Sequence, residues 1–463
     1  MTPGAQVAAA IHLLDEIERG RAPADDIVAN YFRRHRFAGS SDRGAISGHI
    51  YAVLRHRAAL DWWIAKAGQG LAADARHRTL AALVLAEKWT PRQVDQACDG
   101  DRFRPPPLLP GERELVDALE GEALEGPFMP ASVRGNFPDW LHSYLERAFG
   151  GALHEEMAAL NAEAPLDLRV NRLKADREEA RVALRHEDIK AAPTPWSPLG
   201  LRVRERIPLA ALDVFREGLV EVQDEGSQIA ALLADARPGM RVVDFCAGAG
   251  GKTLALAAQM QNRGHLVACD ISAHRLERAT QRLRRAGASI VQRHPLTSHR
   301  DKWVKRHAQS FDRVFVDAPC TGIGTWRRNP DAKWRLRPED VSELAALQAD
   351  ILDSAQRLVK PGGRLVYATC SVLREENEAQ VERFLADHPD FKLVPIARVW
   401  ADTIGTACPA EGGTLRLSTA RHHTDGFFVA ILERARREKK EKGATGTDTV
   451  RPSTHGPSGR GSG

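Results

Sequence analysis

Residues 241–253 read Arg-Val-Val-Asp-Phe-Cys-Ala-Gly-Ala-Gly-Gly-Lys-Thr and decide the fold of the chain. An apolar strand pattern enters a glycine-rich turn, and a helical pattern follows the turn. Glycine in such a turn lets the backbone adopt positive φ and approach a ligand closely. The segment therefore predicts a nucleotide- or nucleoside-binding loop at the end of a strand.

Three kinds of loop compete for this segment. A phosphate-binding P-loop needs glycine where Cys246 stands, and the dinucleotide fingerprint needs a third glycine where Thr253 stands. The remaining interpretation is an S-adenosylmethionine loop, whose backbone packs against the methionine part of the cofactor and holds no pyrophosphate. The residues predicted to bind the cofactor here are Cys246, Ala247, Gly248, Ala249, Gly250, Gly251 and Lys252.

From residue 218 onward, strand and helix patterns alternate. We expect strands over 241–245, 266–269, 289–292, 312–316, 364–369 and 427–432, and a long helix over 338–358. This alternation predicts an α/β fold with a doubly wound, mostly parallel sheet, whose ligands bind at the carboxyl ends of the strands.

Polar residues follow several of these predicted strands. Asp270 ends the second strand, about 20 residues after the loop, where a carboxylate can accept both ribose hydroxyls or can cap the next helix. Asp317 and Cys320 follow the fourth strand, and Cys370 follows the fifth. A lone cysteine after a strand is usually inert packing. Two cysteines at neighbouring strand ends, of which Cys320 is preceded by Asp-Ala-Pro, favour a chemical role for both.

Composition sets the class of protein. The chain has 463 residues, 43% hydrophobic and 27% charged, as is typical of a soluble globular protein. Its net charge is +5, but residues 433–463 hold eight Lys and Arg against four Asp and Glu, so residues 1–432 carry only +1. The six cysteines lack metal-ligand spacing. We find no membrane span or secretory signal pattern and expect a cytoplasmic protein, a monomer without a metal site.

Four segments are predicted along the chain. Residues 1–130 have helical periodicity, and residues 131–217 combine linker helices with a small α/β unit that begins with the alternating segment 166–171. Residues 218–432 form the α/β domain described above. Residues 433–463 turn basic and then rich in Gly, Ser and Thr, which predicts a disordered tail.

Motifs throughout the chain make it similar to a known family. They are residues 223–228, 246–253, 317–324, 327–331, 368–371 and 424–428, in family order, with residues 137–141 and 168–171 upstream and residues 42–61 in the helical part. On these motifs the chain resembles the RsmB/Sun (Fmu) family of S-adenosylmethionine-dependent RNA cytosine-5 methyltransferases. The resemblance implies a Rossmann-like class I methyltransferase domain, preceded by an all-α NusB-like RNA-binding domain and a small α/β RNA-binding domain.

The resemblance also implies roles for individual residues. Carbon 5 of cytosine is a poor nucleophile until a thiolate adds to carbon 6 and makes an enamine. The family assigns this attack to Cys370 and the release step to Cys320, with Asp317 at the cytosine edge and Lys252 near the base. The residues alone leave the order of the thiols open, because DNA cytosine-5 enzymes attack from a Pro-Cys pair that resembles Pro319-Cys320.

RNA contacts are expected in and around the motif of residues 327–331. Carbon 5 is unreachable within a stack, so the target must be single-stranded or flipped. Trp326, Arg327, Arg328 and Lys333 are candidate contacts to bases and phosphates. An arginine-rich helix that includes Arg275 and Arg282 could act likewise or could be an ordinary solvated face. The pair Glu375-Glu376 is interpreted as the acidic first turn of a helix.

Small-subunit ribosomal RNA is the expected substrate, because the family members with a helical N-terminal domain act there. Transfer RNA is the alternative, and a non-catalytic RNA-binding or ribosome-assembly factor is the candidate from another class. Two positions depart from the family pattern: residues 292–295 lack the acidic residue that contacts adenine, and residues 417–419 lack a proline.

Overall fold

The computed structural model describes residues 1–20, 22–205, 207–410 and 412–436, together with Gly456, Gly459, Gly461 and Gly463. The disorder predicted for residues 433–463 therefore lies almost wholly outside the described residues, and residues 433 and 434 end a strand. Within these ranges, no helix has the length and apolar character needed to cross a membrane.

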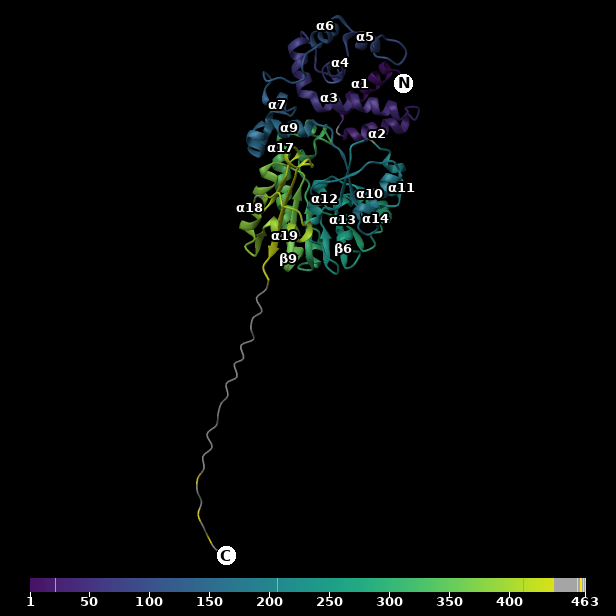
Figure 1. Ribbon diagram of the computed structural model, residues 1–463. Coiled ribbons are helices and arrows are strands. Elements are labelled where there is room, and N and C mark those ends of the chain that lie inside the picture. The colour runs from purple at the N-terminus through teal and green to yellow at the C-terminus, as the bar shows by residue number, and fades with distance from the viewer. Residues whose placement is uncertain are drawn as a thin grey trace.

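The N-terminal part is helical, as predicted, and lies at the top of Figure 1. Its helices pack around one apolar core, in which Leu13, Leu14, Ile46 and Leu60 are fully buried. The first helix begins as its sequence indicates, because Thr2 accepts a hydrogen bond from the Ala5 amide. The elements are α1 (Pro3–Arg19), α2 (Ala24–Arg34), α3 (Ser40–Ala67), α4 (Ala75–Leu85), α5 (Pro91–Ala97) and α6 (Pro110–Leu119).

A layer of short helices joins this part to the α/β domain. It comprises α7 (Ala131–Arg134), η1 (Asp139–Leu141), α8 (His142–Phe149), η2 (Gly150–Ala152) and α9 (Leu153–Asn161). Phe137, Leu145 and Leu160 share a core with Trp326 and Leu373 of the α/β domain. The layer therefore packs against the segments that follow the two predicted catalytic strand ends.

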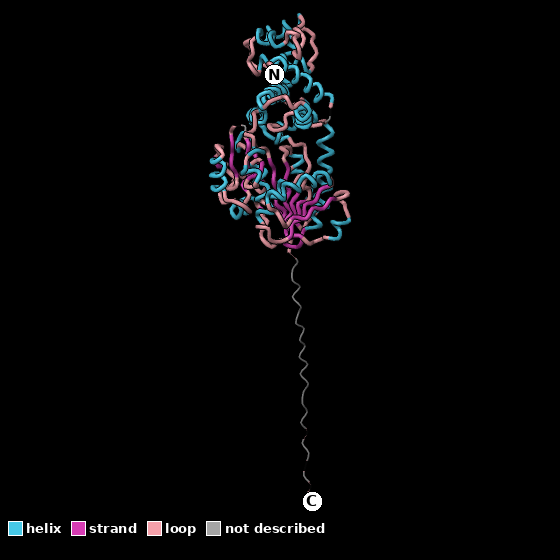
Figure 2. Tube along the Cα trace, turned by 90° about the vertical axis from the view of Figure 1, so that its right-hand side faces the viewer, coloured by secondary structure: helices cyan, strands magenta, loops and turns pink. Residues whose placement is uncertain are grey.

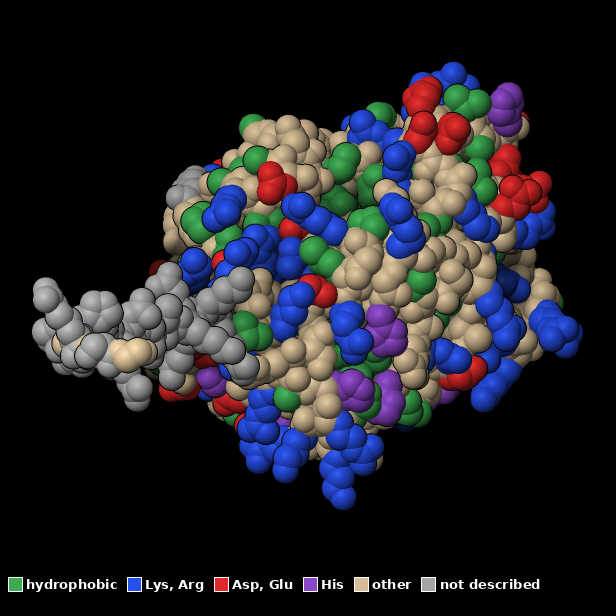
Figure 3. All heavy atoms as spheres, turned by 90° about the horizontal axis from the view of Figure 1, so that it is seen from below, with side chains coloured by type: hydrophobic (Ala, Val, Ile, Leu, Met, Phe, Trp, Pro, Cys, Tyr) green, Lys and Arg blue, Asp and Glu red, His purple; other side chains and the backbone are tan. Residues whose placement is uncertain are grey.

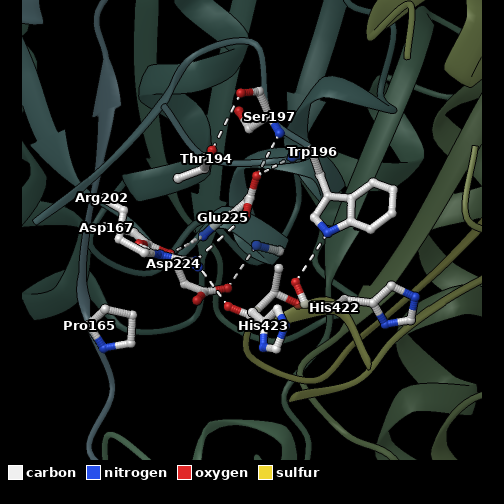
Figure 4. A network of polar contacts seen from close by, with 12 residues as sticks. Pro165, Asp167, Thr194, Trp196, Ser197, Arg202, Asp224, Glu225, His422 and His423 are labelled. Atoms are coloured by element: carbon white, nitrogen blue, oxygen red, sulfur yellow. Dashed lines mark hydrogen bonds and ion pairs between the residues drawn. The ribbon is translucent and has the colours of Figure 1, made fainter. Parts of the chain in front are cut away.

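A small antiparallel sheet of order β2-β3-β1-β4 follows. Figure 4 shows how it joins the α/β domain: the Glu225 carboxylate accepts from the amides of Trp196 and Ser197 at 2.6 and 2.7 Å. Arg202 pairs with Asp167 of the same small sheet at 2.7 Å and also donates to the His423 carbonyl at 3.0 Å. Its elements are β1 (Leu166–Val170), α10 (Arg177–His186), β2 (Ala192–Pro193), β3 (Gly200–Val203), η3 (Leu209–Ala211), α11 (Asp213–Arg216) and β4 (Val220–Val222).

The main sheet, among the strands drawn in magenta in Figure 2, has the order β10-β12-β9-β8-β5-β6-β7, with β11 beside β12. Strands β5 to β9 pair in parallel, and β10, β11 and β12 are antiparallel. The strands are β5 (Arg241–Asp244), β6 (His265–Asp270), β7 (Val291–Pro295), β8 (Phe311–Asp317), β9 (Val359–Thr369), β10 (Phe391–Val394), β11 (Leu415–Leu417) and β12 (Phe427–Arg434).

Helices cover both faces of this sheet, so the predicted doubly wound fold is confirmed. One face packs against α12 (Glu225–Leu232), α13 (Gly251–Gln259), α14 (Ala273–Ala286) and α19 (Ile396–Thr403). The other packs against α15 (Lys302–Arg306), α17 (Pro338–Ala355) and α18 (Glu378–Asp387). Short elements η4 (Ile323–Thr325), α16 (Ala332–Arg335), η5 (Gln356–Leu358), η6 (Arg374–Glu376) and α20 (Thr419–His422) complete this part.

The predicted strands are confirmed with small shifts of their ends. The segment predicted as 289–292 forms β7 at Val291–Pro295, and the segment predicted as 364–369 starts earlier, at Val359. The sequence analysis did not predict β10 and β11, which are only a few residues long and pair with β12.

The direction of the strands places the functional edge. Strand β12 leads out at the bottom of Figure 1 and runs antiparallel to β9, so the parallel strands end at the top, towards the helical part. Figure 3 shows the opposite face, where many Lys and Arg side chains lie at the amino ends of these strands. Surface basic charge is therefore not confined to the functional edge.

Candidate functional site

A cavity of about 690 Å³ opens at the carboxyl ends of the parallel strands. Strands β6 and β7 extend the sheet to one side of β5, and β8 and β9 extend it to the other, so the cavity lies at the topological switch point. Of the predicted site residues, those that line it are Cys246, Ala247, Gly248, Ala249, Gly251, Lys252, Asp270, Asp317, Cys320, Arg328 and Cys370.

The glycine loop combines a ligand-facing part with a packing part. Gly248 has φ +55°, and a Cβ placed there would meet open space. Gly250 has φ +80°, and a Cβ there would lie 2.9 Å from the Cβ of Ala279. Gly250 is absent from the cavity lining, so the structure gives it a packing role in place of the predicted cofactor contact.

Asp270 at the end of β6 holds the loop in place. One of its carboxylate oxygens accepts from the Gly248 amide at 2.8 Å, and the other accepts from the Ser272 amide at 2.7 Å. The cap of α14 is Ser272, whose hydroxyl accepts from the Arg275 amide at 3.3 Å, so Asp270 is not the helix cap. Asp270 shapes the local backbone and lines the cavity, and its ribose contact stays a prediction. Each oxygen keeps a lone pair that a ribose hydroxyl can use.

Asp244, the last residue of β5, is a cavity-lining acid that the sequence analysis did not single out. One carboxylate oxygen accepts from the Thr253 hydroxyl at 2.7 Å, and the other has no hydrogen-bond partner among the described residues. Burial raises the pKa of Asp244 to about 7. Its place directly before the loop, like that of Asp270 after β6, is the signal that could have identified it.

The two predicted catalytic thiols lie together. Because β8 and β9 are adjacent, the Cys320 and Cys370 sulfur atoms lie 3.4 Å apart. The hydrogen bond between the sulfurs, reinforced by burial, raises the pKa of Cys320 well above its ordinary value. Cys320 therefore stays protonated at neutral pH and can donate its proton towards the Cys370 sulfur.

A buried ion pair lies on the same cavity wall. The Lys252 ammonium donates to the Asp317 carboxylate at 2.6 Å and lies 5.2 Å from the centre of the Phe427 ring. Burial acts to lower the pKa of Lys252, but the Asp317 carboxylate outweighs burial and the pKa is raised overall. Lys252 is therefore a fixed and largely buried cation in the cavity wall.

The structure contradicts the RNA contact predicted for Arg327. Its guanidinium is buried and bonds to the carboxylates of Asp224 and Asp425, which Arg328 also binds. Burial and the neighbouring Asp224 raise the pKa of Asp425 to about 6. Arg327 thus neutralises buried acids. Arg328 is partly exposed and lines the cavity, so its RNA contact stays a prediction.

The RNA contacts predicted for Trp326 and Lys333 are also wrong. Trp326 is fully buried in the core shared with the short helices. The Lys333 ammonium is buried as well, and donates to the Arg55 carbonyl and to the Asn161 side chain. Burial lowers the pKa of Lys333 well below its ordinary value. Trp326 and Lys333 therefore belong to the joint with the helical part and present no surface to phosphate.

The far end of the cavity is apolar. Ile271, Leu296 and Ile351 line it, and Ile271 is 68% exposed. At the position where the family has an acidic residue, the His294 ring stacks on Trp303, with centroids 5.2 Å apart. His294 and Trp303 do not line the cavity, so Ile271, Leu296 and Ile351 are the apolar groups it offers to an adenine ring. The cavity thus offers backbone, carboxylate and apolar groups that fit the three parts of S-adenosylmethionine.

One arginine of α14 is also part of the site. Arg282 lines the cavity and donates to the Ala249 carbonyl at 2.9 Å, and its guanidinium pairs with Glu221. It therefore supports the glycine loop from outside. Arg275 lines the cavity rim and is exposed.

Comparisons with known proteins identify similar chains. The family model 16S rRNA methyltransferase RsmB/F matches residues 231–433, and the ferredoxin-like domain of RsmF/B-like methyltransferases matches residues 137–210. The probable ribosomal RNA small subunit methyltransferase B of Synechocystis sp. is 36% identical over 304 residues, 65% of this chain and 67% of that protein.

Two further similarities extend over most of the chain. Ribosomal RNA small subunit methyltransferase B of Klebsiella pneumoniae is 32% identical over 412 residues, 85% of this chain and 91% of that protein. The crystal structure of PH0851 has a TM-score of 0.75 and 29% identity, and the match covers 94% of this chain and 99% of that one. The helical part, the small sheet and the α/β domain are thus arranged as in a solved structure.

Proposed function

Because the chain belongs to the RsmB/F family of 16S rRNA methyltransferases, we propose that it methylates carbon 5 of a cytosine in small-subunit ribosomal RNA. The family is S-adenosylmethionine-dependent, so the cofactor predicted from the glycine loop is confirmed. The observation that carries the cytosine chemistry is the pair of thiols 3.4 Å apart in the same cavity as the Lys252–Asp317 pair.

Each thiol has one role in the proposed reaction. The Cys370 thiolate adds to carbon 6 of cytosine, and the electrons of the carbon 5–carbon 6 double bond make carbon 5 nucleophilic. When bound, S-adenosylmethionine supplies the electrophilic methyl group. Cys320 then takes the proton from carbon 5, after its own proton has left to solvent. The C–S bond breaks with its electron pair returning to Cys370, and the aromatic ring is restored.

The ion pair supports the addition step. Asp317 lies at the end of β8, three residues before Cys320, where its carboxylate can bond the amino or N3 edge of the base. Lys252 holds this carboxylate and places a positive charge beside the wall that carries Cys370. A fixed cation stabilises the negative charge that develops as sulfur adds. The raised pKa of Cys320 keeps it a thiol while Cys370 adds to the base; only after its proton has left to solvent is the Cys320 thiolate a base strong enough for the carbon 5 proton.

The cofactor and the RNA would be held by different parts of the chain. We assign the ribose to Asp270, the methionine part to the Cys246–Lys252 loop and the adenine to the apolar end of the cavity. Residues 1–130 and 131–217 are proposed to hold the RNA, and residues 218–432 to form the catalytic domain. Arg328 at the cavity remains the proposed contact to the target strand.

The test is methyl transfer to defined RNA. The full chain is incubated with labelled S-adenosylmethionine and small-subunit ribosomal RNA, and 5-methylcytosine is mapped by bisulfite sequencing. We expect a discrete methylated cytosine that is absent with Cys370→Ala. Methylation of transfer RNA alone would show that transfer RNA, not ribosomal RNA, is the substrate. If no RNA is methylated, the result would favour a non-catalytic RNA-binding factor.

A further inference from the structure

Glu376 is a buried carboxylate behind the two thiols. It ends η6, six residues after Cys370, and is fully buried. Its carboxylate accepts from the Thr321 amide at 2.9 Å, from the Thr321 hydroxyl at 2.6 Å, from the Gln348 side chain at 2.9 Å and from the Ser371 hydroxyl. It lies in the acidic turn of a short helix, as predicted, but its carboxylate is bonded to residues of other segments.

Two of these donor residues directly follow the catalytic thiols in the chain. Thr321 follows Cys320 after β8, and Ser371 follows Cys370 after β9. One carboxylate thus bonds to both strand-end loops. Gln348 of α17 extends the link, since its amide also donates to the Pro319 carbonyl at 2.9 Å. Glu376 thus links the two loops that carry the sulfurs, in addition to the pairing of β8 with β9.

A purely mechanical link would not require a charge. Glu376 forms no ion pair among the described residues, and its carboxylate is bonded only to neutral donors. Burying a carboxylate without a cation is unfavourable unless hydrogen bonds satisfy it. Its negative charge is also one of the causes that raise the pKa of Cys320. The carboxylate thus acts on the protonation of one thiol as well as on the position of both.

We propose that Glu376 is a positioning residue that sets the spacing of the two thiols by holding the loops at the ends of β8 and β9 together. The role of this spacing in catalysis rests on the proposed function, in which both thiols act on the same cytosine. It adds a residue outside the cavity to the machinery, since Glu376 is not among the residues that line it. Its effect must therefore appear in thiol reactivity, not in binding of the cofactor.

The test compares Glu376→Gln with Glu375→Gln. Glu375 is the adjacent acid, partly exposed and paired with Arg147 on the surface, so it is a matched control. In the cofactor-free full chain, the rates at which iodoacetamide alkylates Cys320 and Cys370 are measured by mass spectrometry as a function of pH. In Glu376→Gln, we expect Cys320 to be alkylated several-fold faster at alkaline pH, because removal of the buried negative charge favours the Cys320 thiolate.

Catalysis supplies the second readout. Single-turnover methyl transfer by Glu376→Gln should fall at least about tenfold, with the affinity for S-adenosylmethionine unchanged. Thr321→Val removes only the hydroxyl donor and should shift both readouts in the same direction by less. It replaces Glu376→Gln if that variant does not fold.

The outcomes separate this proposal from the proposed function. Alkylation profiles that match the parent chain in folded variants, with only the unfolding temperature lowered, would overturn the positioning role. If the parent chain transfers no methyl group to any RNA, the proposed function fails, but the alkylation profiles still decide whether Glu376 controls the thiols.

Discussion

Two neighbouring stretches of the α/β domain differ in how their polar residues are used. The strand-end loops carry Asp317, Cys320 and Cys370 into the cavity, as predicted. The stretch 326–334, which starts six residues after Cys320, was expected to present aromatic and basic side chains to RNA. It instead buries Trp326 and Lys333 in the joint between the α/β domain and the helical part.

The difference lies in what fixes each side chain. A residue at the carboxyl end of a parallel strand reaches the crevice whatever the rest of the chain does. Whether an arginine is solvated depends on partners from elsewhere in the chain: Arg327 meets Asp224 and Asp425, 103 and 98 residues away. Basic residues within a motif therefore do not by themselves indicate contact with nucleic acid.

The largest effect is expected at the strand ends. Cys370→Ala should lower turnover at least about a thousand-fold, because the nucleophile has no substitute. Cys408→Ala is the control, since Cys408 is also partly exposed but lies away from the cavity. Initial rates with labelled cofactor and excess RNA measure both. Equal rates for the two variants would contradict a catalytic role for Cys370, because a thiol away from the cavity would then matter as much as one at the strand end.

The second effect is on stability, in the joint. Arg327→Ala should lower the free energy of unfolding by about 3 kcal/mol, because Asp224 and Asp425 lose one of their two cations while buried. Arg374→Ala removes an exposed pair with Glu382 and should change it by less than about 1 kcal/mol. Urea unfolding measures both. If Arg327→Ala is as stable as the parent chain but binds RNA weakly, the prediction that Arg327 contacts RNA would be correct after all.

Lys333→Met tests the same contrast between buried and exposed basic residues, and its expected effect on stability is smaller. The buried ammonium should contribute nothing to RNA affinity, so the dependence of the dissociation constant on salt should match that of the parent chain. Loss of its hydrogen bonds should cost about 1–3 kcal/mol of stability.

Arg275→Ala removes an exposed cation at the cavity rim. If Arg275 contacts a phosphate, the slope of the logarithm of the binding constant against the logarithm of the salt concentration should fall in magnitude by about one. Filter-binding titrations at several salt concentrations distinguish them.

The smallest effect concerns pH and cofactor binding. The pKa of Asp244 is about 7, above its ordinary value, so the carboxyl is largely protonated below that pH. The cofactor carries net positive charge and favours the ionised carboxylate, so its binding releases a proton. Affinity should therefore rise with pH up to about 7, by at most about tenfold per unit. Calorimetry should show this slope in the parent chain and none in Asp244→Asn.

Much of the site follows from the sequence, and the exceptions have a common cause. The glycine loop, Asp270, Asp317 and both thiols were predictable because strand ends determine where they lie. Glu376 was not, because an acid after a strand is read as a helix turn until the hydrogen bonds from Thr321 and Ser371 are seen. Burial by distant segments, as at Trp326, leaves no local pattern.

The most direct test of the account is covalent trapping by Cys320→Ala. This variant can still add Cys370 to cytosine but lacks the group assigned to release. With small-subunit RNA and S-adenosylmethionine, we expect a protein–RNA species that survives denaturing electrophoresis and is absent from Cys320→Ala/Cys370→Ala. A trapped species with Cys370→Ala instead would exchange the two roles, and no trapped species with either variant would contradict the covalent mechanism.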